Sequence, residues 1–320
     1  MKERLPTKSL VEGAFLAAIT TVLFIISIYV PLLGTLVSFL CPLPIIFLYL
    51  RHNLKFTLLS LLVAGILVSI IAGLLQGIII LISFGILGLT LGYTIKREYT
   101  FTQIILFGSM ASLLSKLLIL WLGFWLLDIN PFIFDLEQLD TIINQSLNFY
   151  QGLGLSEEQL ALLKDNLIQT LNIFRIVFPA LLILASLFDV FINYLVSRIV
   201  LQRFAYRLPG FVSFSYWRAS PSCVVSYLIG WLFIFIGARY NLPLLNKIGI
   251  NIQIFFTILF FITGLSLVNF FMEKYNIKSF FKWIIYILVF LLPFLSQLAT
   301  WAGIFDVWID FRRFREAGVK

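Results

Sequence analysis

The sequence predicts an all-α polytopic membrane protein, a transmembrane helical bundle of about nine spans, with eight possible. Hydrophobic residues make up 61% of the chain and charged residues 12%, and the mean hydropathy is +1.04. Soluble domains average about 25% charged residues. Residues 57–95 alone give 39 consecutive positions without a formal charge. A helix needs only ~20 residues to cross the ~30 Å hydrocarbon core.

Charges, prolines and polar clusters divide the chain into nine apolar segments. A charged N-terminal segment precedes the first apolar segment, as in a signal peptide. No small-residue cleavage site follows, so we expect the first apolar segment to be retained as a membrane span. The expected spans are 10–30, 33–50, 56–74, 77–95, 101–127, 170–200, 222–238, 252–272 and 280–302.

The charges between the spans predict an orientation. Basic residues precede the first span, separate the second from the third and the fourth from the fifth, and recur without acids in the segment 198–218. By the positive-inside rule these segments and the N-terminus are cytoplasmic, and we expect the membrane to be the cytoplasmic membrane or a comparable energy-coupling membrane. Nine crossings would place the basic tail outside, so either the last segment does not cross fully or earlier charges outweigh the tail. The tail carries Arg312, Arg313, Arg315 and Lys320.

The connection 128–168 holds seven acidic residues against the single Lys164 and is expected outside. Apolar residues recur at three and four positions on both sides of Gly152 and Gly154, which is the period of one helix face. Ser156 with Gln159 matches a capping box that opens the second of two helices. The connection therefore predicts an amphipathic helical hairpin on the outer membrane surface, continuous with the sixth span.

Polar residues inside the spans are the candidates for a binding site. Lys116 and Asp189 lie at depths that differ by only ~3 Å when counted from the cytoplasmic ends of their spans. They can form an ion pair that either fixes helix packing or contacts a ligand or proton. Asn193 is one turn from Asp189, and Asn269 lies in the eighth span; both suit either helix packing or ligand contact.

Small residues mark close helix contacts. Glycine and serine spaced by four in the third and fourth spans predict packing inside the bundle. The first span carries a similar face beside Glu12, near the cytoplasmic boundary, where a partner could dock instead. That face consists of Gly13, Ala14, Ala17 and Ala18.

The segment GIFDVWIDFRR near the C-terminus carries a charged motif without an assigned role. Asp306 and Asp310 share a helix face, and Asp310 can pair with Arg313. Two carboxylates one turn apart suit cation binding or acid–base chemistry. The alternative is an interfacial cap anchored by tryptophans. The motif residues are Asp306, Trp308, Asp310 and Arg312.

Other function classes lack their motifs in this chain. There is no GxxxxGK[ST] loop, GLGL at 152–155 lacks the third glycine of a dinucleotide loop, and no HExxH occurs. His52 beside Arg51 is expected to be an orientation charge. We expect no cofactor, no metal and no enzymatic activity. The net charge of +8 is spread over short inter-span segments rather than one face, so no nucleic-acid partner is expected.

Several segments together resemble the YybS-like family of bacterial membrane proteins, whose domain has no assigned function. They are LVEGAFLAAITTVL, PLPIIFLYLRHNLK, the glycine-rich third and fourth spans, and GIFDVWIDFRR. The first six spans also resemble the substrate-binding S-components of energy-coupling-factor transporters, which have six helices and an AxxxA face on the first. Ala14 with Ala18, and Gly13 with Ala17, match that pattern, so the resemblance implies a coupling partner at this face; the last three spans and the acidic hairpin have no counterpart there.

Two functions remain open. The first is a non-enzymatic membrane protein that binds a small molecule or lipid in its helical core, as a transport subunit that needs a partner for energy. The alternative is a scaffold or assembly factor that holds another membrane complex through the first span or the outer hairpin. We expect a six-helix core over residues 1–205 and a three-span extension over residues 206–320.

Overall fold

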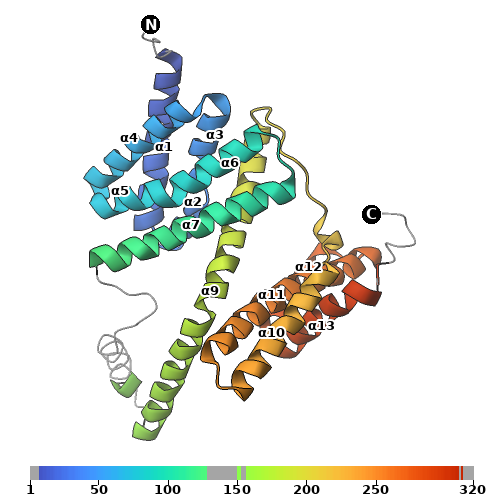
Figure 1. The fold of residues 1–320 in the computed structure, drawn as a ribbon. Helices are drawn as coiled ribbons and strands as arrows, with labels where there is room; N and C mark the ends of the chain where they lie inside the picture. Colours follow the sequence, from blue (N-terminus) through green and yellow to red (C-terminus); the bar gives the residue numbers. More distant parts are fainter. Residues whose placement is uncertain (1–6, 128–149, 153–155, 310, 313–320) are drawn as a thin grey trace. The chain divides into compact units, whose positions relative to one another are not determined.

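A computed structural model describes residues 7–127, 150–152, 156–309 and 311–312 of the chain. Within these ranges the regular elements are all helical (Figure 1). In chain order they are α1 (Thr7–Tyr29), α2 (Leu33–Ser38), α3 (Pro42–Arg51), α4 (Leu54–Ala72), α5 (Leu74–Ile80), the π-helical turn η1 (Leu81–Gly85), α6 (Ile86–Lys96), α7 (Phe101–Leu127), α9 (Glu157–Gln202), the 3₁₀ turn η2 (Phe214–Tyr216), α10 (Pro221–Arg239), α11 (Pro243–Lys274), α12 (Ser279–Leu291) and α13 (Pro293–Ile309).

The helical bundle confirms the predicted fold class. Eight segments of the described chain are long and apolar enough to cross a membrane, with α2–α3 and α5–α6 each counted as one. The ninth predicted span, 280–302, is not one straight helix. It falls on α12 and α13, which meet at a bend of 100°. Pro293 begins α13, and proline cannot donate the backbone hydrogen bond that would continue α12.

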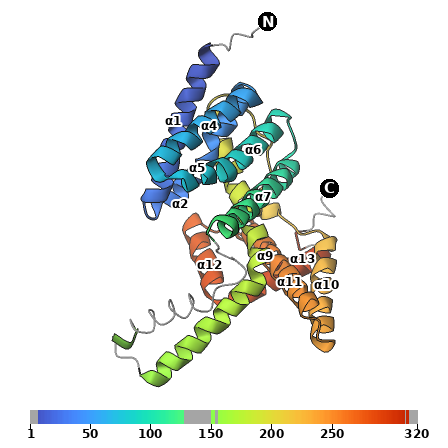
Figure 2. The same ribbon diagram turned by 60° about the vertical axis from the view of Figure 1, so that its left-hand side comes forward.

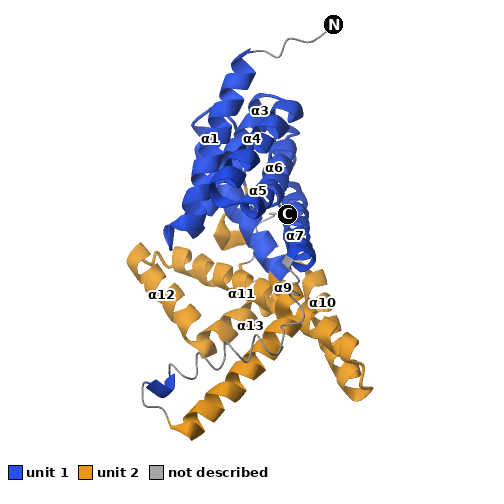
Figure 3. Cartoon of the chain, turned by 90° about the vertical axis from the view of Figure 1, so that its left-hand side faces the viewer, with its two compact units in different colours: residues 1–154, 182–210 blue, residues 155–181, 211–320 orange. Residues whose placement is uncertain are grey.

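The chain forms two compact units (Figure 3). Unit 1 comprises residues 1–154 and 182–210, and unit 2 comprises residues 155–181 and 211–320. The chain passes between the units at three places, 154/155, 181/182 and 210/211, whereas one domain boundary was expected, near residue 205. The second falls inside α9, so the N-terminal part of that helix groups with unit 2.

In unit 1, α1 packs against α4, α3 against α6, and α6 against α7. Close approach depends on small residues, as the sequence predicts for the third and fourth spans. A Cβ on Gly77 would overlap the Ser69 hydroxyl and lie 2.6 Å from the Gly65 carbonyl oxygen. Gly73 joins α4 to α5 with φ +97, a conformation that glycine adopts without strain.

In unit 2, α10 and α11 run side by side as an antiparallel pair, and α13 packs on α11. The two backbones meet closely at Gly230 and Gly249, where a Cβ on Gly249 would lie 2.7 Å from the Gly230 carbonyl oxygen. A buried apolar cluster joins this pair to α13. Its members are Ala219, Val224, Phe260, Ile304 and Val307.

The helix α9 is continuous over 46 residues (Figure 2). Its first turn confirms the predicted capping box: Ser156 N donates to Gln159 Oε1 at 3.0 Å, and Gln159 N donates to Ser156 Oγ at 3.4 Å. The continuity of the second predicted hairpin helix with the sixth span is confirmed as well. The first hairpin helix lies outside the described residues, apart from 150–152.

An asparagine from α11 supports α9 at its internal Pro179. Asn251 Oδ1 accepts a bond from Ala180 N at 2.9 Å, and Asn251 Nδ2 donates to the Ile176 carbonyl at 2.6 Å. A side chain inserted into the backbone ladder beside a proline satisfies groups that would otherwise lie unpaired in the hydrocarbon region.

Candidate functional site

The structure brings Lys116 of α7 and Asp189 of α9 together inside unit 1. Lys116 Nζ lies 3.0 Å from Asp189 Oδ2. The ion pair that their matched depths predict is therefore present. The two side chains are 29% and 26% exposed, so the pair is open on one side.

Two buried side chains hold the carboxylate of Asp189. Ser112 Oγ donates to Asp189 Oδ2 at 2.7 Å, and Asn193 Nδ2 donates to Asp189 Oδ1 at 2.9 Å. Lys116 Nζ also donates to Ser112 Oγ at 2.6 Å. An ammonium group has three N–H donors; Ser112 and Asp189 take two, and among the described residues no acceptor is recorded for the third.

Close packing of α7 against α9 fixes this geometry. A Cβ on Gly108 would lie 2.6 Å from Val190 Cγ1, so glycine lets the helices approach two turns from Lys116. The sequence analysis identified Lys116, Asp189 and Asn193 but missed Ser112. The available signal was its spacing, because a residue four positions before Lys116 shares its helix face.

Asn269, the fourth predicted ligand residue, lies in unit 2 with its own partners. Its Nδ2 donates to Ser215 Oγ at 2.7 Å and to Glu273 Oε1 at 3.1 Å, and its Oδ1 accepts a bond from the Tyr286 hydroxyl at 2.7 Å. Asn269 therefore joins η2, α11 and α12. It belongs to a different polar cluster from Lys116 and Asp189.

The tail motif places two of its charged side chains in the interior of unit 2. The side chains of Asp306 and Arg312 are 1% and 0% exposed, and Arg312 Nη2 lies 3.3 Å from Asp306 Oδ2. Arg218 approaches the same carboxylate at 3.8 Å. Trp308 is exposed, as an anchor would be, and Asp310 lies outside the described residues.

The four residues of the predicted docking face of α1 lie on two neighbouring faces of the helix, one buried and one exposed. Gly13 and Ala17 are buried, and a Cβ on Gly13 would lie 2.5 Å from Ser60 Oγ of α4. These two residues pack inside the bundle and are not open to a partner. Ala14 and Ala18 lie on the neighbouring face and are exposed.

A polar contact near the start of α1 escaped the sequence analysis. His52 Nδ1 lies 3.0 Å from Ser9 Oγ, and His52 Nε2 lies 2.7 Å from Glu12 Oε2, while Arg51 pairs with Glu12 at 3.1 Å. His52 thus joins the end of α3 to α1, beyond its expected role as an orientation charge. Ser9 is only 6% exposed, whereas the side chains of Arg51 and Glu12 are 42% and 23% exposed, so the cluster is buried at Ser9 and open at Arg51.

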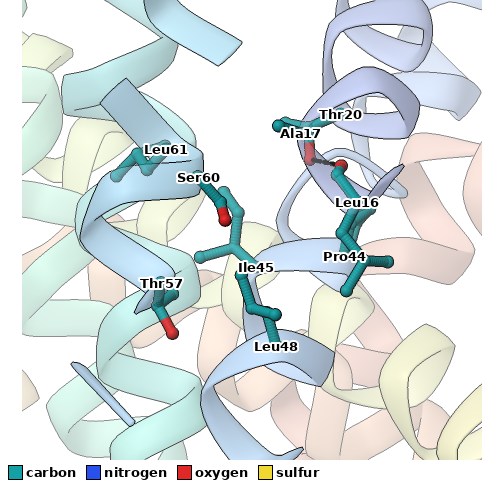
Figure 4. A pocket seen from close by; sticks show the side chains of 9 residues that line it. All are labelled: Leu16, Ala17, Thr20, Pro44, Ile45, Leu48, Thr57, Ser60 and Leu61. Carbon is teal, nitrogen blue, oxygen red and sulfur yellow. Dashed lines mark hydrogen bonds between the residues drawn. The ribbon is translucent and has the colours of Figure 1, made fainter. Parts of the chain in front are cut away.

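A small pocket of about 10 Å³, room for roughly one water molecule, lies between α1, α3 and α4, and Figure 4 shows its lining side chains. The lining is apolar except for the hydroxyls of Thr20, Thr57 and Ser60. Small-molecule sites typically measure roughly 300–1,000 Å³. Within the described residues, no group of three or more potential metal ligands occurs.

Comparisons with known proteins identify the family of the chain. The family described as "Predicted membrane protein (DUF2232)" matches residues 18–307. "Uncharacterized protein YybS" of Bacillus subtilis (strain 168) is 27% identical over 313 residues, which cover 96% of this chain and 98% of that protein. No solved structure matches significantly, and the resemblance to transporter S-components gains no support. The chain therefore belongs to the DUF2232 family of predicted membrane proteins.

Proposed function

We propose that this integral membrane protein binds a small molecule or lipid, through a polar group of that ligand, at the Lys116–Asp189 pair. The observation that carries the proposal is the open side of the pair, in the middle of two membrane spans. Lys116 lies 15 residues after Phe101, the start of α7, and Asp189 lies 13 residues before Gln202, the end of α9. Each is therefore roughly 20 Å along its helix from that end.

Charged side chains are energetically unfavourable at this depth in a membrane. An ionisable side chain at the bilayer centre costs about 2.5–3.5 kcal/mol on insertion scales, so it is normally paired and turned away from lipid. A pair that only fixes helix packing is best sealed by its neighbours. Unit 2 contains such a pair in Asp306 and Arg312, whose side chains are 1% and 0% exposed. Lys116 and Asp189 are far more open, which favours contact with a further molecule.

The small pocket is separate from the proposed ligand site. The pocket between α1, α3 and α4 does not include Lys116 or Asp189. A ligand at the pair would therefore lie against the α7–α9 surface of unit 1. That position suits a lipid, or a small molecule that moves along helix faces. The function fits a non-enzymatic transport subunit that depends on a partner for energy.

Native mass spectrometry of the purified protein tests this proposal. Wild type should retain a bound small molecule or lipid, and the double variant Lys116→Met/Asp189→Asn should lose it, because both charges disappear while side-chain volume is largely kept. Lys282→Met is the matched control, since it removes a lysine from a pair in unit 2. An unliganded wild type, or equal retention by the double variant, would contradict the proposal.

A scaffold function is the second candidate, and the exposed Ala14 and Ala18 favour it. Small residues let two helix backbones approach closely, which is a main source of helix association within lipid. Both lie on α1 one turn apart, with Val11 and Phe15 exposed beside them. A partner helix could therefore pack on this face without disturbing the internal contact of Gly13 and Ala17.

The sequence charges support an orientation for either function. The N-terminus and the segment 198–218 would be cytoplasmic, and the acidic connection 128–168 would be outside. The membrane would be the cytoplasmic membrane or a comparable energy-coupling membrane.

A further inference from the structure

The last two helices of unit 2 are individually short for a membrane crossing. α12 has 13 residues and α13 has 17, which correspond to about 20 Å and 26 Å at ~1.5 Å per residue. The hydrocarbon core is ~30 Å thick. The bend of 100° between them prevents the pair from acting as one straight span.

Contacts with α11 show how deep α12 reaches. Lys282 Nζ lies 4.0 Å from Glu273 Oε1, and Tyr286 donates to Asn269 at 2.7 Å. The rings of Phe290 and Phe261 follow at 6.4 Å between centroids. Later residues of α12 contact earlier residues of α11, so the two helices are antiparallel.

The deepest of these contacts marks the limit of α12. Phe261 lies 13 residues before Lys274, the last residue of α11, which is about 20 Å along the helix. α12 ends at Leu291, one residue after Phe290, and the bend follows. α12 therefore turns before it has travelled the thickness of the hydrocarbon core.

α13 crosses α11 at this same level. A Cβ on Gly264 would overlap the Ala299 carbonyl group, and a Cβ on Gly303 would lie 2.8 Å from Gly264 N. From there Ile304 and Val307 enter the apolar cluster with Val224, near the start of α10.

The end of α13 is bonded to the segment that leads into α10. Arg218 Nη2 donates to the carbonyl of Asp306 and, at 3.1 Å, to that of Val307. Beyond the helix, Arg312 Nη1 donates to the Ser215 carbonyl at 2.5 Å. The chain after α13 is therefore on the side of the membrane where α10 begins.

The start of α12 is tied to this side as well. α10 and α11 are antiparallel, with Gly237 beside Asn246 at the far end, so the beginning of α10 and the end of α11 share a side. Ser215 Oγ donates to Glu273 Oε2 at 2.5 Å, directly before α12. The end of α11, from which the chain enters α12, and the end of α13 thus both contact the segment 211–220.

We propose that α12 and α13 form a re-entrant hairpin, which enters and leaves the membrane on the side of Arg218 and contacts the acyl chains of that leaflet. Its aromatic side chains are open to lipid: Phe280 is 70%, Trp283 69%, Phe290 80% and Phe294 72% exposed. The polar groups at its base are paired with protein, as membrane-embedded irregular backbone requires.

This topology also accounts for the basic tail. With eight crossings instead of nine, the residues after α13 share a side with the N-terminus and with the arginine-rich segment 198–218. All three basic regions then obey the positive-inside rule, which nine crossings would violate at the tail. The inference does not depend on a ligand at Lys116 and Asp189.

Cysteine labelling in sealed vesicles of known orientation tests the hairpin. Single cysteines are placed in a Cys41→Ala/Cys223→Ala background at exposed positions and treated with a membrane-impermeant maleimide. Phe311→Cys should react only from the side that labels Ser213→Cys, which lies in the segment before α10. Tyr240→Cys, between α10 and α11, is the opposite-side control.

The tip of the hairpin supplies a second readout. Leu291→Cys should resist the reagent from both sides, because acyl chains surround it. Reaction of Phe311→Cys from the side that labels Tyr240→Cys would overturn the proposal, as would rapid labelling of Leu291→Cys from that side. Ile309→Cys, also exposed, repeats the test if Phe311→Cys fails to insert.

Discussion

Lys116 Nζ and Asp189 Oδ2 lie 3.0 Å apart in unit 1, and both side chains keep about a quarter of their surface open. Asp306 and Arg312 of unit 2 lie 3.3 Å apart and are sealed. The chain thus contains an open and a closed ion pair. The closed pair joins α13 to the segment beyond it, whereas the open pair joins α7 to α9.

A double-mutant cycle measures the coupling of the open pair. Lys116→Met and Asp189→Asn should each lower the free energy of unfolding by about 1–3 kcal/mol, because each leaves a partner without its counter-charge or hydrogen bond. The double variant should recover part of the loss. Thermal unfolding in detergent measures all four proteins, and strictly additive losses would argue against contact.

The sealed pair should be more sensitive to the loss of one partner. Arg312→Met removes the guanidinium 3.3 Å from the buried carboxylate of Asp306, and we expect a loss of about 3–5 kcal/mol. Lys282→Met removes a lysine 4.0 Å from Glu273, whose side chain is 48% exposed, and should cost at most about 1 kcal/mol. Equal stability of the two variants in the same unfolding assay would count against a sealed structural pair.

The two small-residue faces of α1 should respond differently to leucine. Ala17→Leu should overpack the interior beside α4 and cost about 1–3 kcal/mol. Ala18→Leu should leave the isolated protein stable, because its side chain points outward. If the exposed face binds a partner helix, only Ala18→Leu should abolish co-purification with near-normal unfolding. Destabilisation by Ala18→Leu alone would reverse the assignment of the two faces.

The orientation can be checked at the first residue of the capping box of α9. In the background without Cys41 and Cys223, Ser156→Cys should react with an impermeant maleimide from outside and Ser213→Cys from the cytoplasm, because the acidic connection precedes one and the arginine-rich segment the other. Labelling of Ser156→Cys from the cytoplasm only would show that the predicted orientation is wrong.

The sequence alone was sufficient to predict those structural features that a single physical rule determines. Span length, the capping box at Ser156 and the matched depths of Lys116 and Asp189 follow from helix rise and from the cost of unpaired groups in lipid. It was insufficient for Arg312, because this residue follows the end of α13 at Ile309 and its other partners, Ser215 and Thr263, lie far away in the sequence. It was also insufficient for α1, since Gly13 and Ala14 begin two adjacent faces with the same spacing, and hydropathy does not tell which one packs inside.

Cryo-electron microscopy of wild type and of Lys116→Met/Asp189→Asn, both purified in the same lipid nanodiscs, tests the binding site most directly. Wild type should show non-protein density within hydrogen-bond distance of Lys116 Nζ on the open side of the pair. The double variant should retain its helices and lack this density. A wild-type map in which protein side chains fill that position, with no density between them, would contradict binding at this site.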